Sequence, residues 1–127
     1  MSEQALVRLK YGSASWNRWR EEHSRAAITL DGVKLDGMIL TGIDFSGVSL
    51  RGASLHAVNL MNANLRGADL TGANLREADL IAANLQGAIL YGACLHEADL
   101  LGADLTDARY SAEDLTGALH VPNVPAR

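Results

Sequence analysis

Residues 63–80 read ANLRGADLTGANLREADL, with a leucine at every fifth position and an alanine two residues before each leucine. The leucine register extends from residue 30 to residue 105, and Phe45 is its single exception. The position two residues before each centre is always apolar, and it is alanine at every repeat from residue 63 to residue 108. A period of five drifts around an α-helix and switches faces in a β-strand. The pattern therefore predicts a repeat in which each five-residue unit forms one short side of a coil and then turns.

Glycines mark the turns of this coil. Eleven of the twelve glycines lie two residues after a centre. Glycine adopts at no steric cost the positive φ that the third residue of a type II turn requires. Asn62 occupies the same slot and tolerates a left-handed backbone, whereas Glu77, Glu97 and Asp107 adopt it less readily. We therefore predict a turn after each centre.

The alternation of Ala-Asn-Leu and Ala-Asp-Leu units in residues 63–80 resembles the pentapeptide-repeat family, with its A(D/N)LXX repeats, and specifically its short bacterial or cyanobacterial members. The resemblance covers about two thirds of the chain. Family members fold as a right-handed quadrilateral β-helix with four pentapeptides per coil. The resemblance therefore implies an all-β solenoid of about four coils, in which residues twenty positions apart stack in columns. At roughly 4.8 Å per coil, the stack would be about 20 Å tall.

The two ends of the chain depart from the repeat. Residues 1–25 read as a helical capping segment in which Trp16 and Trp19 share one helix face. We interpret these tryptophans as a lid on the first coil, with a partner-helix or ligand site as the alternative. Near the other end, Tyr110 can fill a centre position, and Ser111 followed by Asp114 resembles a helix-start signal. We therefore expect a β-helix over residues 26–110 and a C-terminal cap and tail over residues 111–127.

Charge and cysteine usage limit the function classes. Residues 1–25 carry five Lys or Arg against three Asp or Glu, whereas residues 26–108 carry four against ten. An acidic coil argues against nonspecific nucleic-acid binding, which requires a basic footprint. The single cysteine, Cys94, excludes an internal disulfide and favours a reducing, cytoplasmic location. The sequence shows neither a secretory leader nor a long apolar run, so we expect no membrane association.

One predicted column is the best candidate for a partner contact. The residues that follow the centres at twenty-residue spacing are Thr41, Met61, Ile81 and Leu101, so three apolar side chains would stack on an otherwise polar surface. Contiguous exposed apolar patches often mark protein contacts. The candidate site comprises three apolar and four acidic residues: Met61, Ile81, Leu101, Glu77, Asp79, Glu97 and Asp99.

The sequence favours a noncatalytic protein-interaction or scaffold module with an unidentified protein partner. It contains no Ser/His/Asp cluster, phosphate-binding glycine loop or cysteine/histidine metal spacing, so we predict neither an enzyme nor a cofactor. The alternative, which the resemblance implies, is a DNA-mimicking, gyrase-binding protein of the quinolone-resistance type. About four coils and capping signals at both ends weigh against that alternative. We expect a monomer, or a weak dimer joined sideways through Met61, Ile81 and Leu101.

Overall fold

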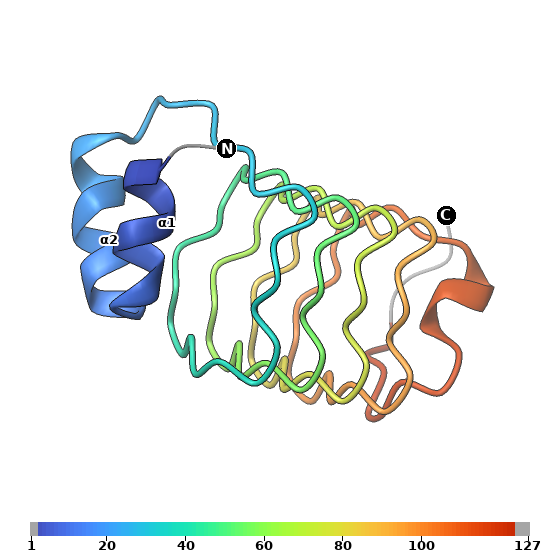
Figure 1. Ribbon diagram of the computed structural model, residues 1–127. Helices are drawn as coiled ribbons and strands as arrows, with labels where there is room; N and C mark the ends of the chain where they lie inside the picture. Colours follow the sequence, from blue (N-terminus) through green and yellow to red (C-terminus); the bar gives the residue numbers. More distant parts are fainter. Residues whose placement is uncertain (1–2, 124–127) are drawn as a thin grey trace.

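The computed structural model describes residues 3–123, in which two helices stand at one end of a coil (Figure 1). Helix α1 spans Glu3–Lys10 and helix α2 spans Ser13–Glu22. A short 3-10 helix, Ala112–Leu115, lies near the other end. The outermost parts of the two predicted terminal segments, residues 1–2 and 124–127, lie outside the described residues.

Each turn of the coil contains twenty residues. Parallel β-bridges join residues at this spacing, as in the series Thr29, Ser49, Asp69, Ile89 and Arg109. The coil has four sides, which we name by their first residues: the 29–31, 34–36, 39–41 and 44–46 sides. Bridges define five levels on the 29–31 and 39–41 sides and four levels on the other two. The ladder continues to Leu119, which bridges Asp99 beyond the 3-10 helix.

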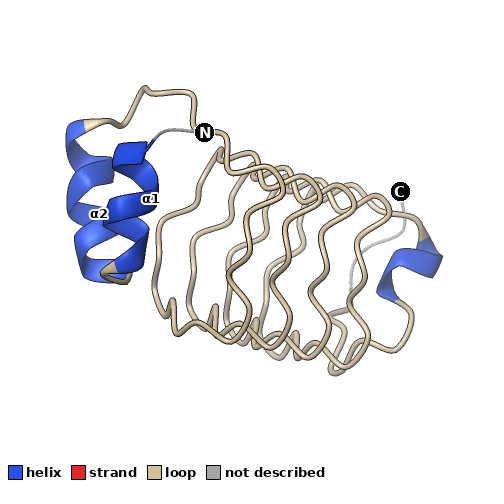
Figure 2. Ribbon diagram, viewed as in Figure 1, coloured by secondary structure: helices blue, strands red, loops and turns tan. Residues whose placement is uncertain are grey.

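The sides consist of isolated bridges, and residues 3–123 contain no continuous strand, as the tan trace in Figure 2 shows. The expected stacking of coils is present as a ladder of parallel bridges. The expected β-strands are absent from residues 3–123, and each side is instead a single bridged residue between two turns. Turns recur every five residues, and only the middle residue of the three between turns pairs as a bridge. The twenty-residue spacing of the ladder is the feature that four pentapeptides per coil predict.

The corners are the turns that the sequence predicts. At the first corner, the Val33 N–H donates to the Leu30 carbonyl over 3.0 Å, and Gly32 has a φ of 71°. Six corners in the repeat adopt the same positive φ without glycine: Ala57, Asn62, Glu77, Ala82, Glu97 and Asp107. A left-handed backbone costs an L-residue roughly 1–2 kcal/mol. These six corners are therefore strained relative to their glycine equivalents.

The core is a narrow column filled by the centre residues and the apolar residues two positions before them. Every centre from residue 30 to residue 105 is at most 5% exposed. Phe45 departs from leucine because it meets the helical cap: its ring packs edge-on against the Trp16 indole, with centroids 5.3 Å apart. Here the Phe45 and Trp16 rings fill the space that the leucines of a preceding coil fill elsewhere in the stack.

Asp and Asn side chains just before the centres brace the turns. Asn64 Oδ1, for example, accepts a hydrogen bond from the Arg66 N–H over 3.0 Å. Asp44, Asn59, Asp69, Asn74, Asp79, Asn84, Asp99 and Asp104 make the equivalent bond two residues ahead. Such local bonds are the reason that Asx residues favour turns. The A(D/N)LXX signature is thus explained by backbone hydrogen bonding.

Candidate protein-binding face

Exposed apolar side chains gather on the 39–41 side of the coil. This side is continued in successive coils by residues 59–61, 79–81, 99–101 and 119–121, and we call the five segments together the apolar face. The bridges Ile39–Asn59–Asp79–Asp99–Leu119 hold the segments in register. Main-chain pairing therefore aligns the side chains of this face in columns along the solenoid axis.

The structure places Met61, Ile81 and Leu101 in one column of this face. The Asn62 N–H donates to the Ile81 carbonyl and the Ala82 N–H donates to the Leu101 carbonyl, so the three residues occupy consecutive coils. Leu101 is 52% exposed, whereas Met61 and Ile81 are half-buried. Three further apolar residues of the apolar face are exposed: Ile39 (74%), Leu119 (45%) and Val121 (43%). Val121 continues the column beyond Leu101, whereas Ile39 and Leu119 lie at the two ends of the adjacent column of bridged residues.

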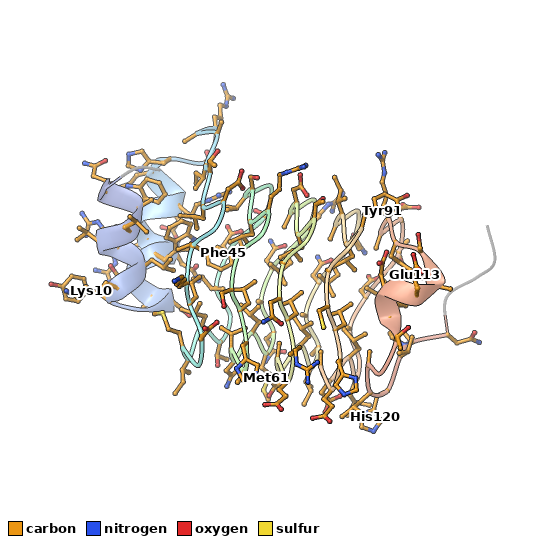
Figure 3. The ribbon with its side chains drawn as sticks, turned by 45° about the vertical axis from the view of Figure 1, so that its right-hand side comes forward. Lys10, Phe45, Met61, Tyr91, Glu113 and His120 are labelled. Carbon is orange, nitrogen blue, oxygen red and sulfur yellow. The ribbon has the colours of Figure 1, made fainter. Side chains whose placement is uncertain are left out.

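The other three sides carry few apolar residues that face outward. Apart from the buried centres, the 44–46 side has none, the 34–36 side has only Cys94, and the 29–31 side has Ile89 and Tyr91. In Figure 3, Met61 and His120 lie along the lower edge of the solenoid and Tyr91 lies at the upper edge. The six apolar residues of the apolar face are therefore a one-sided feature.

Strained corners border the same face. The corner before it passes through Ala57, Glu77 and Glu97, and the corner after it passes through Asn62 and Ala82. Five of the six strained repeat corners thus lie along its two edges, and only Asp107 lies elsewhere. Space does not explain this distribution, because a Cβ at Gly37, Gly42 or Gly52 would meet no atom within 4 Å. Local backbone strain tends to cluster at functional sites.

The four predicted acidic residues lie on or beside the apolar face, and each has a partner. Asp79 and Asp99 accept hydrogen bonds of 3.0 Å from the N–H groups of Ile81 and Leu101. Glu77 and Glu97 project from the corner, where their carboxylates lie 3.3 Å from His56 Nε2 and 3.4 Å from His96 Nε2. Asp99 also lies 2.9 Å from His120 Nδ1. The hydrogen bonds from His120 and from the Leu101 N–H hold the pKa of Asp99 below its usual value.

The pKa values of three other carboxyl groups on the coil are also lowered. The Ser54 hydroxyl and the His56 N–H lower the pKa of Asp36. The Thr106 hydroxyl and N–H lower the pKa of Asp104. Burial opposes the shift at Asp69, but hydrogen bonds from Thr71 and Arg51 outweigh it and lower its pKa.

We expect the protein to lose stability in acid. A carboxyl group whose pKa is lower in the folded state contributes stability that is complete above its unfolded pKa, near 3.8, and is lost as pH falls through its folded pKa. The midpoint of urea unfolding, measured by circular dichroism, should be constant from pH 7 to 5 and fall below about pH 4. Asp69→Asn keeps an acceptor for Thr71 but cannot titrate, so its midpoint should fall less. An unchanged wild-type midpoint at pH 2.5 would contradict this expectation.

The residues predicted to cap the solenoid all lie at its ends. Trp16 is completely buried and its Nε1–H donates to the Asp44 carbonyl over 2.6 Å. Trp19 is 7% exposed, and its indole centroid lies 5.2 Å from that of Trp16. Tyr110 is half-buried against the far end of the core.

Comparison with protein families identifies the repeat. The sequence model of the family described as pentapeptide repeats matches this chain with eight copies, in residues 30–67 and 59–97. The chain belongs to the pentapeptide-repeat family. No curated protein matches it.

Solved structures of other pentapeptide-repeat proteins resemble this one. A protein from Nostoc PCC 7120 is 32% identical, with a TM-score of 0.62 over 85% of this chain and 95% of that one. A protein from the thylakoid lumen of Arabidopsis thaliana is 31% identical, with a TM-score of 0.61; the match covers 68% of this chain and 64% of that one. QnrB1, a plasmid-mediated fluoroquinolone resistance protein, is 20% identical, with a TM-score of 0.52 over 67% of this chain and 52% of that one. That last likeness shows a shared fold alone.

Sequence reasoning missed three members of the apolar face in this pentapeptide-repeat protein. Ile39 precedes its centre and occupies the Asx column, and this signal was available once the twenty-residue columns were aligned. Leu119 and Val121 lie twenty residues after Asp99 and Leu101, but the repeat pattern of leucine and alanine ends before them, because the 3-10 helix intervenes. Within residues 3–123, no group of three His, Cys, Asp or Glu side chains could hold a metal ion. No helix in the described part of the chain is long and apolar enough to cross a bilayer.

Proposed function

We propose that this pentapeptide-repeat protein is a noncatalytic scaffold, a right-handed quadrilateral β-helix whose apolar face holds a protein partner. One observation carries the proposal: six apolar side chains line a single side of the coil, between the two corners that hold five of the six strained positions. Polar residues at these positions and glycine at these corners would build the same coil at lower strain. A selected contact surface explains both departures.

The charges around the apolar face favour a basic partner. Glu77, Asp79, Glu97 and Asp99 surround the column, and no Lys or Arg lies in its five segments. Arg76, which precedes Glu77 in its turn, is the one cation at the two flanking corners. An apolar protein segment flanked by Lys or Arg would bury the column and pair with these carboxylates. A second copy of the chain would instead place carboxylates against carboxylates, and like charges across an interface are unfavourable. We therefore favour a monomer that binds a different protein.

The DNA-mimic alternative receives less support. Likeness to QnrB1 extends to the fold alone, and the five levels of the ladder span only about 20 Å at the usual spacing. Asp31, Asp36, Asp44, Asp69, Asp79, Asp99 and Asp104 all accept hydrogen bonds from backbone N–H groups of the coil itself. The acidic composition is thus explained by turn geometry. Purified protein at micromolar concentration should leave gyrase supercoiling unchanged.

We also propose a cytoplasmic location. Cys94 is a free thiol on the coil, which suits a reducing compartment. The Arabidopsis structure comes from the thylakoid lumen, so pentapeptide-repeat coils occur in more than one compartment.

Affinity capture with two matched variants tests the proposed face. Leu101→Lys places a cation in the apolar column, which should repel a basic partner. Tyr91→Lys makes the same addition at a residue that is 48% exposed on the opposite side. Wild type and Tyr91→Lys should retain the same protein from a lysate, and Leu101→Lys should lose it. Capture should weaken as salt rises, because salt screens exposed charge pairs.

Three outcomes would overturn this proposal. Equal capture by both variants would place the contact elsewhere. Light scattering that shows a wild-type dimer, converted to a monomer by Leu101→Lys, would make the apolar face a homodimer interface. Inhibition of gyrase supercoiling by wild type would favour the DNA-mimic alternative.

A further inference from the structure

The first coil has a main-chain edge that no earlier coil covers. In the Thr29–Ser49 bridge, the Leu30 N–H donates to the Ser49 carbonyl and the Ser49 N–H donates to the Ile28 carbonyl. This pattern leaves the N–H and C=O of Thr29 itself pointing away from the second coil. The same holds for the other first-level bridged residues: Lys34, Ile39 and Asp44.

Helix α2 pairs only one of the four sides of this edge. The Asn17 side-chain amide pairs with this side as the main chain of a neighbouring strand would. Its Nδ2 donates to the Gly42 carbonyl and its Oδ1 accepts from the Asp44 N–H. The Trp16 indole donates to the Asp44 carbonyl, and Arg20 donates to the Ser46 carbonyl. No residue in the range 3–123 pairs with the main-chain N–H or C=O of Thr29, Lys34 or Ile39.

A cavity adjoins this edge at Thr29, and neither Lys34 nor Ile39 lines it. Its volume is about 410 Å³, and it is lined by Gln4, Trp19, His23, Ala26, Ala27, Ile28 and Thr29. Cavities of roughly 300–1,000 Å³ are typical of binding sites. The lining thus combines aromatic and aliphatic surface with an unpaired strand edge.

The aromatic wall of the cavity also contains unused hydrogen-bonding groups. The His23 and Trp19 rings stack, with centroids 4.5 Å apart. His23 Nδ1 lies 2.8 Å from the Trp19 carbonyl, so Nδ1 is the donor and Nε2 of the neutral ring is an acceptor. Trp19 Nε1 is buried, with no partner in the described part of the chain. Because the Trp19 Nε1 atom is buried, a ligand in the cavity would contact the ring and not this N–H.

We propose that this end of the solenoid binds an extended peptide of another protein by strand addition at Thr29. The main chain of the peptide pairs with the Thr29 N–H and C=O, and one large apolar side chain fills the cavity against Trp19 and Ile28. Strand addition draws affinity from main-chain hydrogen bonds and specificity from an adjacent side-chain pocket. The Thr29 edge supplies the main-chain hydrogen bonds, and the cavity supplies the side-chain pocket. This site is independent of the apolar face, which begins on a different side of the coil.

Edge-specific proline variants test this inference. The probes are five capped hexapeptides of sequence Thr-Val-X-Val-Thr-Lys, with X as Phe, Trp, Leu, Met or Val. Thr29→Pro removes an N–H that makes no bond within residues 3–123, and proline is tolerated at such edge positions. Lys34→Pro is the matched control, because Lys34 has the same register and an equally unpaired N–H but lies away from the cavity. Amide chemical shifts in ¹⁵N spectra report binding and site together.

At least one probe should bind wild type below about 1 mM, which is weak but measurable, and shift the amides of residues 26–29. Thr29→Pro should weaken that probe about fivefold or more through loss of one main-chain hydrogen bond. Lys34→Pro and the face variant Leu101→Lys should bind as wild type does, so failure here is distinguishable from failure of the scaffold proposal. The inference is overturned if all five probes fail at 5 mM, if Thr29→Pro binds equally well, or if the shifted amides lie elsewhere.

Discussion

Trp16→Ala should destabilise the protein by about 3–5 kcal/mol, the usual cost of removing a buried aromatic side chain. The Trp16 side chain is completely buried, packs edge-on against Phe45 and donates its indole N–H to the Asp44 carbonyl. Its removal opens a cavity above the first coil and leaves an edge carbonyl unpaired. Equilibrium unfolding in urea, followed by circular dichroism, measures the loss.

A conservative variant separates the two contributions of this side chain. Trp16→Phe keeps a ring over Phe45 but cannot donate to Asp44, so it should cost about 1–3 kcal/mol, the penalty of an unsatisfied buried acceptor plus a smaller ring. If Trp16→Ala costs less than 1 kcal/mol, the helices do not stabilise the coil, and the lid interpretation fails.

Leu75→Ala should cost about 2–5 kcal/mol, as large-to-small changes in a well-packed core do. Leu75 is completely buried in the middle of the stack. Each coil contacts only its two neighbours, so surrounding layers have little freedom to collapse into the space. The measurement is again the free energy of unfolding in urea.

Two neighbouring controls make the result specific. Arg76→Ala alters an exposed residue one position away and should stay within about 0.5 kcal/mol of wild type. Leu75→Met preserves volume and should cost less than about 1.5 kcal/mol. Equal values for Leu75→Ala and Arg76→Ala would show that position 75 does not face the core.

Much of the fold could be predicted because the repeat has a strict period. Leucine at every fifth residue specifies which side chains are inward, and glycine two residues later specifies positive φ. Both are local consequences of residue type. The lack of continuous strands was harder to predict, since resemblance to a β-helix implies strands, whereas five-residue sides leave room for only one bridged residue each.

The candidate face could be predicted only in part. The column of Met61, Ile81 and Leu101 followed from counting in twenties, but its extension through Leu119 depended on how the chain returns after Ala112–Leu115. Ala57 and Ala82 are unremarkable in sequence, and their importance appears only when their φ values are compared with the side of the coil that they border. The unpaired strand edge at Thr29 could not be predicted from the sequence. Tertiary packing determines which side of the first coil α2 covers, and therefore which sides remain unpaired.

The contacts that α2 makes with the coil have an evolutionary consequence. Asn17 and Arg20 bond the backbone groups of Gly42, Asp44 and Ser46, which every pentapeptide presents regardless of its side chains. Duplication or deletion of a twenty-residue unit beyond the first coil would leave this junction unchanged. Phe45, which meets Trp16, and Ser46, whose hydroxyl accepts a hydrogen bond from Arg20, tie the cap to particular side chains. Solenoid length can therefore vary between descendants of such a gene while one helical cap is inherited intact.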